Sequence, residues 1–213
     1  MKNGVLAALV VAASMPAAAL AQSPKGATYI TDEQVKAVNA GPGVDRQIVN
    51  VDIGKLNLAV GIIHRGPSGA PAAPAPAAAS ATPAAPAAAP CGERATTAPP
   101  AGTASGIAHD GQTETYIIVS GGGTLVTGGR IVNGRQSAPE SAVTKVLNGP
   151  SCSGPIVGTD VVKQVVKTGD IIIIPAGVPH GWMDIADHVD YLSVRPDPDR
   201  VLAAGYVNPL IKK

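Results

Sequence analysis

The sequence predicts an all-β protein in which many short strands form one sandwich or barrel. Runs rich in Val, Ile and Thr recur along the chain, and turns that contain Gly or Pro separate them at close spacing. This pattern is typical of β-sandwiches and β-barrels. Only one segment has the features of a helix, so a doubly wound sheet is excluded, because that fold needs strands and helices that alternate.

The composition excludes one class of partner. The chain has 213 residues, with 16 Lys and Arg against 15 Asp and Glu, so its formal net charge is only +1. A chain so close to neutral lacks the basic surface that nucleic acid requires, and we expect no nucleic-acid partner. The hydrophobic share of 45% overstates the core, because the first residues and an Ala/Pro-rich insertion inflate it.

Residues 1–21 have the three parts of a secretory signal peptide. Lys2 supplies a positive charge, the run that follows is apolar and small, and Ala19-Leu20-Ala21 has the small-x-small pattern that signal peptidase needs. The run is short for a membrane span, and Ser14 and Pro16 interrupt it. We expect a secreted or periplasmic bacterial protein that has no membrane partner after cleavage.

The N-terminal segment, residues 22–45, is predicted to contain one short helix. Thr31 and Gln34 have the spacing of a capping box, in which each side chain binds the backbone N–H of the other residue. Val35 and Val38 follow at helical spacing.

A hairpin and an insertion follow. Residues 47–53 and 56–65 carry β-branched side chains around Gly54-Lys55, which predicts two paired strands. Residues 67–102 are then rich in Ala and Pro, and we expect this low-complexity insertion to be extended and disordered, because it has few large side chains to bury. Residues 22–66 are too few to form a stable core alone, so the insertion interrupts one domain.

Further strands are expected after the insertion, separated by turns at Gly121-Gly122-Gly123 and at Gly128-Gly129. The barrel is expected to span residues 46–200, with residues 201–213 as a C-terminal tail. Arg195, which precedes Pro196, is interpreted as a charge at a strand end. The expected strands lie at 113–119, 124–127, 130–133, 161–166, 170–174 and 188–194.

The two cysteines, Cys91 and Cys152, predict a disulfide. An even number of cysteines in an exported protein is typical of disulfide pairing. Neither residue lies in a C-x-x-C pattern or near a His, which disfavours a metal site for the pair.

Two of the four histidines lie in segments that have suitable ligands for a metal ion. One segment runs from His109 to Gly121, and the other runs from Gly169 to Asp184. Imidazole nitrogens and a carboxylate can bind a divalent transition metal, and two His with one carboxylate leave coordination positions open. The two segments are far apart in the sequence, so a barrel would have to bring them together.

The second segment resembles the second motif of the cupin superfamily, in particular of its single-domain conserved-barrel (cupin type-2) members. Gly169, Pro175, Gly177 and His180 have the spacing of that motif, and Asp184 stands where Asn is usual. The resemblance implies a single cupin-type β-barrel, or jelly roll, that the Ala/Pro-rich insertion interrupts.

The first segment is similar to the first cupin motif, which is a His-x-His pair followed by four residues, a Glu, six residues and a Gly. Counting back from Gly121 puts Glu114 at the carboxylate and His109 at the second His, while the first His position falls on Ile107. The resemblance implies that His109, Glu114 and His180 hold a divalent transition metal, with Fe, Mn, Zn and Ni as candidates.

A fourth metal ligand would have to come from elsewhere, and His64 is the candidate. It lies on the predicted strand 56–65, which can neighbour the other ligands in a barrel. Ile62 shares its face, so this face can equally be a barrel interior without metal.

Alternation along two strands places four further side chains beside the predicted ligands. They are the candidate lining of a substrate pocket: Tyr116, Ile118, Trp182 and Asp184.

These features favour an exported barrel that binds a metal ion and a small organic molecule. As an enzyme, it would use the open metal positions to polarise a bound oxygen, which favours a dioxygenase, isomerase or lyase reaction. The sequence does not decide whether the chain is an enzyme. Two alternatives stay open: a metal-free barrel that binds or senses a small molecule, and a homodimerisation module, since cupins often pair through outer strands.

Overall fold

The computed structural model describes residues 26–68 and 88–212. The predicted signal peptide, residues 1–21, lies outside these residues, as does most of the predicted insertion, residues 69–87. Among the described residues, no helix is both long enough and apolar enough to cross a membrane.

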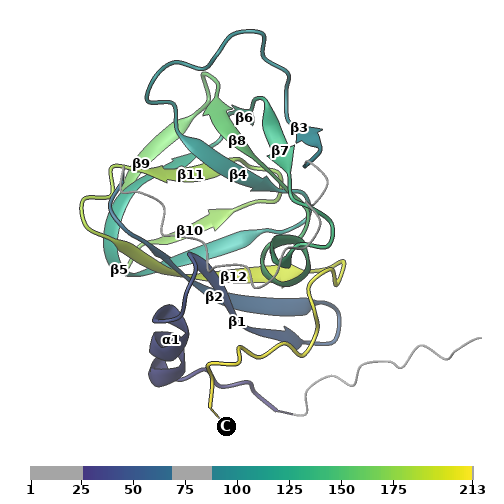
Figure 1. The fold of residues 1–213 in the computed structure, drawn as a ribbon. Coiled ribbons are helices and arrows are strands. Elements are labelled where there is room, and N and C mark those ends of the chain that lie inside the picture. Colours follow the sequence, from purple (N-terminus) through teal and green to yellow (C-terminus); the bar gives the residue numbers. More distant parts are fainter. Residues whose placement is uncertain (1–25, 69–87, 213) are drawn as a thin grey trace, which may run out of the picture.

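The described residues form a jelly-roll β-barrel with one short N-terminal helix, as the sequence predicts (Figure 1). The helices are α1 (Asp32–Asn39) and a π-helix, η1 (Val143–Leu147). The strands are β1 (Asp45–Asp52), β2 (Asn57–Arg65), β3 (Pro90–Cys91), β4 (Ser105–His109), β5 (Glu114–Thr127), β6 (Arg130–Ile131), β7 (Gly134–Gln136), β8 (Ser151–Val157), β9 (Val162–Lys167), β10 (Ile171–Ile174), β11 (His180–Met183) and β12 (Val189–Asp197).

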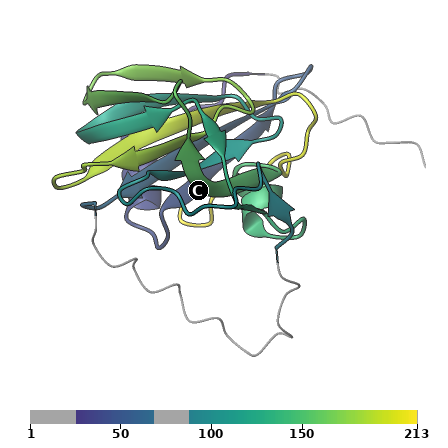
Figure 2. The same ribbon diagram turned by 90° about the horizontal axis from the view of Figure 1, so that it is seen from above.

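One antiparallel sheet folds over to form both layers of the barrel (Figures 1 and 2). Its strands follow the order β1-β2-β12-β5-β11-β4-β8-β7-β3, and β9 and β10 pair with β5, while β6 pairs with β8. The predicted hairpin is confirmed, because β1 and β2 pair directly.

Strand β5 joins the two layers, which corrects the predicted turn at Gly121-Gly122-Gly123. Its first half pairs with β12 and β10, and its second half pairs with β11 and β9. Gly121 has φ of 67°, and a Cβ atom there would lie 2.0 Å from the carbonyl oxygen of His188. The glycines therefore bend β5 and let its backbone pass close to its neighbours. Gly128-Gly129, with φ of 81° and 67°, does form the predicted turn.

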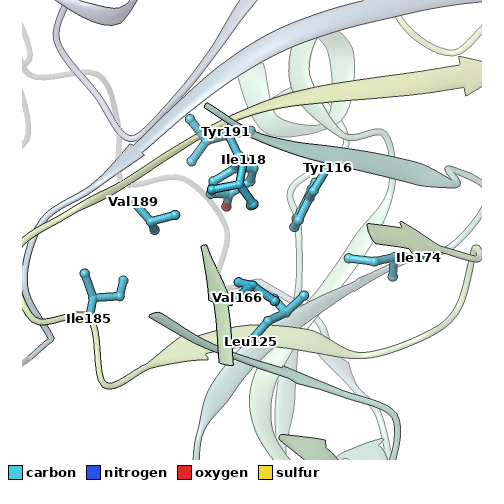
Figure 3. Close-up of a cluster of buried hydrophobic side chains, with 9 residues drawn as sticks. Tyr116, Ile118, Leu125, Val166, Ile174, Ile185, Val189 and Tyr191 are labelled. Carbon is cyan, nitrogen blue, oxygen red and sulfur yellow. The ribbon is translucent and has the colours of Figure 1, made fainter. Parts of the chain in front are cut away.

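Two clusters of buried apolar side chains hold these elements together. The first fills the barrel: Ile63, Tyr116, Ile118, Leu125, Val166, Ile174, Ile185, Val189 and Tyr191. The side chains of this cluster that Figure 3 labels come from both layers and point toward one another. The second lies between α1 and the outer face of β1 and β2: Val38, Ile48, Val49 and Ile62. The predicted capping box of α1 is present, with Thr31 and Gln34 as reciprocal partners.

The described end of the predicted insertion, residues 88–102, is tied to the barrel. Strand β3 pairs with β7, and Cys91 forms the predicted disulfide with Cys152 in β8. Part of the region predicted to be disordered is therefore structured, because a covalent bond and a short ladder anchor it.

The C-terminal residues also pack against the barrel. The backbone N–H groups of Gly205 and Asn208 donate to the carbonyl oxygens of Asn50 and Ile48, at 2.9 and 2.8 Å. Leu202 is only 1% exposed. These contacts cover the outer edge of β1, which would otherwise be an unpaired strand edge.

Candidate metal centre

Three predicted ligands meet inside the barrel. His109 ends β4, Glu114 begins β5 and His180 begins β11. Their ligand atoms all lie within 4.8 Å of one another, and the side chains are 2%, 1% and 3% exposed. Residues that are far apart in the sequence are thus brought together by the sheet order, in which β11 lies between β4 and β5.

Local backbone contacts fix the three positions. Strand β4 pairs with β11 so that Ile107 lies opposite His180. The N–H of Gly177, in the turn before β11, donates to the carbonyl oxygen of His109 at 2.8 Å. The Pro-x-Gly turn of the second motif therefore links the end of β4, which carries His109, to the start of β11, which carries His180.

The carboxylate of Glu114 is held at both oxygens. Arg195 Nε and Ser193 Oγ donate to Oε1 at 2.7 and 2.8 Å. Tyr116 donates from its hydroxyl to Oε2 at 2.8 Å, and the Nε2 atoms of His109 and His180 each lie 3.0 Å from the same oxygen. Since Oε1 is occupied by donors, Oε2 is the oxygen that Glu114 can offer to a metal.

Charges around the carboxylate favour its ionised form. Burial raises the pKa of Glu114, but the charge of Arg195 lowers it, and this pKa lies well below its usual range. Arg195, which is 1% exposed, also binds Asp45 at 2.6 Å. Burial and the nearby Glu114 carboxylate raise the pKa of Tyr116 well above its usual value.

The partners of the two Nδ1 atoms set the imidazole tautomers. His180 Nδ1 lies 3.0 Å from the carbonyl oxygen of Val178, which can only accept a hydrogen bond. His109 Nδ1 lies 2.8 Å from Ser151 Oγ, whose own hydroxyl donates to the carbonyl oxygen of Gly149 at 2.9 Å. Both Nδ1 atoms therefore carry the proton, and in a neutral ring each Nε2 presents a lone pair.

This arrangement fits a metal ion. Two lone pairs face one carboxylate oxygen at 3.0 Å, and three acceptors at this spacing need a cation between them. His180 Nε2 is buried and has no hydrogen-bond partner among the described residues. Two imidazoles and one carboxylate suit Fe, Mn, Zn or Ni and leave positions open for other ligands.

His64 does not join this group. Ile62, on the same face of β2, packs in the cluster under α1, so this face points out of the barrel. The His64 side chain is 45% exposed, and its Nδ1 lies 2.7 Å from Asp190 Oδ1. The prediction of His64 as a fourth ligand is therefore corrected, because the alternation of β2 points the side chain away from the other ligands.

The four residues predicted to line a pocket lie in different settings. Tyr116 and Ile118 are buried in the core, and Trp182 packs against it and donates to the hydroxyl of Tyr191 at 3.2 Å. Asp184 is exposed just after β11, with φ of 52°. A hollow of about 380 Å³ lies outside β1 and β2, and one of about 350 Å³ lies beside residues 100–104. The role of these four residues in ligand binding stays a prediction.

The sequence interpretation missed Arg195, Ser193 and Ser151. Arg195 was expected at a strand end, but it lies inside β12, in a strand whose alternate residues are buried from Val189 to Asp197. This alternation is the signal that could have placed Arg195 on the inner face, opposite Glu114.

The two cupin-like motifs thus lie on neighbouring strands of one barrel, and their His and Glu residues converge. The chain has a cupin-type barrel. No protein-family model and no curated protein matches this sequence.

Several solved structures are similar to this chain. An uncharacterized conserved protein with a double-stranded β-helix domain from Klebsiella pneumoniae is 14% identical, over 85% of this chain and 99% of that one, with a TM-score of 0.40. The oxalate decarboxylase of Lactobacillus farciminis is 13% identical, over 73% of this chain and 28% of that one, with a TM-score of 0.35. A predicted oxalate decarboxylase from Thermotoga maritima is 13% identical, over 72% of this chain and 92% of that one, with a TM-score of 0.30. These values are low, so the reactions of those proteins are no guide to the activity of this chain.

Proposed function

We propose that the chain is an exported cupin-type barrel protein that binds one divalent transition-metal ion through His109, Glu114 and His180. A small organic molecule is its second ligand, bound at the open positions of the metal. Tyr116, Ile118, Trp182 and Asp184 are the proposed lining of that pocket.

One observation carries this proposal. Both imidazoles have their Nδ1 protons committed to Ser151 Oγ and the Val178 carbonyl oxygen, so two Nε2 lone pairs converge on a buried carboxylate oxygen. A purely structural histidine cluster would direct an N–H at the carboxylate. Here the partners of Nδ1 favour the opposite tautomer, which is the one that binds metals.

The donor set also defines the chemistry on offer. A metal held by two His and one Glu polarises a bound oxygen atom, which suits dioxygenase, isomerase or lyase reactions. Arg195 and Ser193 hold Oε1 and so keep Oε2 directed at the imidazoles. The buried surroundings exclude bulk water from this group.

Metal content tests the proposal. One sample is protein purified without chelator, and the others are loaded in turn with Mn²⁺, Fe²⁺, Zn²⁺ or Ni²⁺. Each sample is desalted and analysed by elemental mass spectrometry. We expect about one ion per wild-type chain and much less in His180→Ala. His64→Ala is the matched control, because His64 lies outside the group, and it should bind as the wild type does. Equal metal content in wild type and His180→Ala would refute the proposal.

The alternative is a metal-free barrel that binds or senses a small molecule. Two observations favour it. Ile107 stands at the usual His position, and Glu114 already has a positively charged partner in Arg195. In that barrel a proton on one imidazole takes the place of the metal. Absence of bound metal from the wild-type protein under every loading condition is the result that selects this alternative.

Export is proposed from residues 1–21 and is supported by the disulfide. Disulfides persist in oxidising compartments, such as the bacterial periplasm or the cell exterior. Cell fractionation and N-terminal sequencing of the mature protein test this location, with a mature N-terminus at Gln22 as the expected result. The homodimer and the absence of nucleic-acid and membrane partners are proposals of the same kind, which light scattering and binding measurements would test.

A further inference from the structure

The hydroxyl of Tyr116 reaches the same atom as the two imidazoles. It lies 2.8 Å from Glu114 Oε2, and the Nε2 atoms of His109 and His180 lie 3.0 Å from this oxygen. Four heteroatoms from β4, β5 and β11 therefore meet at one point inside the barrel.

The fold explains why Tyr116 points there. Tyr116 follows Glu114 by two residues on β5, so both side chains lie on the inner face of the strand. The Tyr116 ring packs edge-on to the ring of His180, with 5.9 Å between centroids. The side chain is 4% exposed, so packing leaves its hydroxyl little freedom to turn away.

The position at which the first cupin motif has its first His carries no donor in this chain. Ile107 lies directly across from His180 in the β4–β11 ladder, and its side chain has no atom that can bind a metal. Among the described His, Cys, Asp and Glu residues, only His109, Glu114 and His180 form a group able to hold an ion. A further protein ligand must therefore be a residue of another type.

We infer that Tyr116 supplies the fourth protein ligand, through its phenolate oxygen, to the metal that the proposed function assigns to this site. The inference rests on that proposed function and adds one donor to it. Binding exchanges the O–H bond of Tyr116 for an oxygen–metal bond, and the proton leaves on a water molecule that the incoming metal ion brings with it. The hydrogen bond from Tyr116 to Oε2 is lost at the same time, which frees Oε2 for the metal.

Tyr191 shows what a tyrosine with a structural role looks like in the same core. Its ring lies 4.3 Å from that of Tyr116 between centroids, and it is 1% exposed. Its hydroxyl oxygen accepts from Arg65 Nε at 3.0 Å and from Trp182 Nε1 at 3.2 Å. In contrast, the described hydrogen bonds of the Tyr116 hydroxyl go only to Glu114.

Phenolate is a hard, anionic oxygen donor, and a set of two imidazoles, one carboxylate and one phenolate can hold ferric iron as well as divalent ions. Fe³⁺ can therefore serve as a spectroscopic probe of this site. Tyrosinate bound to Fe³⁺ also produces a charge-transfer absorption band in the visible range. Neither imidazole nor carboxylate ligands produce this band with Fe³⁺.

The test is visible absorption and resonance Raman spectroscopy of the full mature chain loaded with Fe³⁺ from its nitrilotriacetate complex. We expect the wild type to become coloured, with tyrosine ring vibrations enhanced on excitation in the band. Tyr116→Phe should lose the band and bind Fe³⁺ about tenfold or more weakly. Tyr191→Phe is the matched control, because it removes an equally buried hydroxyl from the same core, and it should keep both properties.

The outcomes separate this inference from the proposed function. Wild-type protein that binds Fe³⁺ without the band, or a Tyr116→Phe variant that keeps the band and the affinity, overturns the role of Tyr116 and leaves the three-ligand site intact. Wild-type protein that binds neither Fe³⁺ nor any divalent ion overturns both. Circular dichroism of each variant checks that the fold is retained, and loss of the band in Tyr191→Phe as well as in Tyr116→Phe would also count against the inference.

Discussion

Ser151 Oγ accepts a hydrogen bond from His109 Nδ1–H at 2.8 Å, so a serine on β8 selects the tautomer of a candidate metal ligand on β4. The two residues are also opposite each other in the ladder between these strands. Next to Ser151 is Cys152, whose disulfide ties β8 to residue 91. The candidate metal site and the disulfide-anchored part of the barrel are therefore connected through adjacent residues of β8.

Ser151→Ala should weaken metal binding without unfolding the barrel. Loss of the acceptor for Nδ1–H lets His109 adopt the other tautomer, in which Nε2 carries the proton and cannot bind a metal. Such supporting hydrogen bonds commonly contribute about 10-fold to 100-fold to metal affinity. Competition with a coloured chelator measures the change. Ser153→Ala, at an exposed residue of the same strand, is the control, and an equal effect of both variants would contradict this role.

Arg195→Met should destabilise the fold strongly. The substitution leaves the Glu114 and Asp45 carboxylates without their buried partner, a change that typically costs about 3 to 5 kcal/mol. Arg200→Met removes an ion pair with Asp52 at the surface and should cost much less, because solvent screens an exposed ion pair. Urea unfolding measures both values, and similar losses in the two variants would show that Arg195 has no special role.

The free energy of unfolding should fall in acid because of Glu114. Its folded pKa lies well below the ordinary value of 4.5, so the unfolded chain takes up a proton first as pH falls. Stability from this group is complete above about pH 5 and is lost as pH falls toward the folded pKa. Unfolding of the metal-free protein in urea at a series of pH values measures the slope. Glu114→Gln should have a smaller slope in this range, and an unchanged slope would assign the acid sensitivity to other groups.

Reduction of the disulfide should lower stability by about 4 kcal/mol in the chain-entropy account, given a separation of 61 residues. A Cys91→Ser, Cys152→Ser variant should match the reduced wild type. Urea unfolding with and without reductant compares the two. A variant as stable as the oxidised protein would mean that the strand contacts of β3 hold residues 88–102 without the covalent bond.

Gly121→Ala should disrupt the bend in β5. A Cβ atom there would lie 2.0 Å from the His188 carbonyl oxygen, and φ of 67° adds about 1 to 2 kcal/mol of backbone strain for a residue other than Gly. Gly66→Ala is the control, since a Cβ at Gly66 has no neighbour within 4 Å. Thermal unfolding of both variants is the measurement, and equal midpoints would contradict the proposed bend.

Local patterns predicted the parts of the fold that depend on neighbouring residues. The capping box of α1, the β1–β2 hairpin and the Gly128-Gly129 turn each need only residues within one short segment. The residue spacing of the cupin-like motifs was also sufficient to predict three candidate ligands, which the barrel brings together.

Features that depend on tertiary pairing were missed. Strands β4 and β8 contain small residues and, in β8, Gly154-Pro155, which local propensity does not favour in a strand. Three consecutive glycines predict a turn unless the neighbours on both sides of β5 are known. Arg195 and Glu114 are 81 residues apart, so only the pairing of β12 with β5 reveals their contact.

A crystal structure of the metal-loaded chain, with an anomalous difference map at the absorption edge of the metal, tests the central claim most directly. We predict one strong peak about 2.0 to 2.3 Å from His109 Nε2, His180 Nε2 and Glu114 Oε2. A map with no peak among these three atoms, or with the metal bound only elsewhere on the chain, would contradict the account.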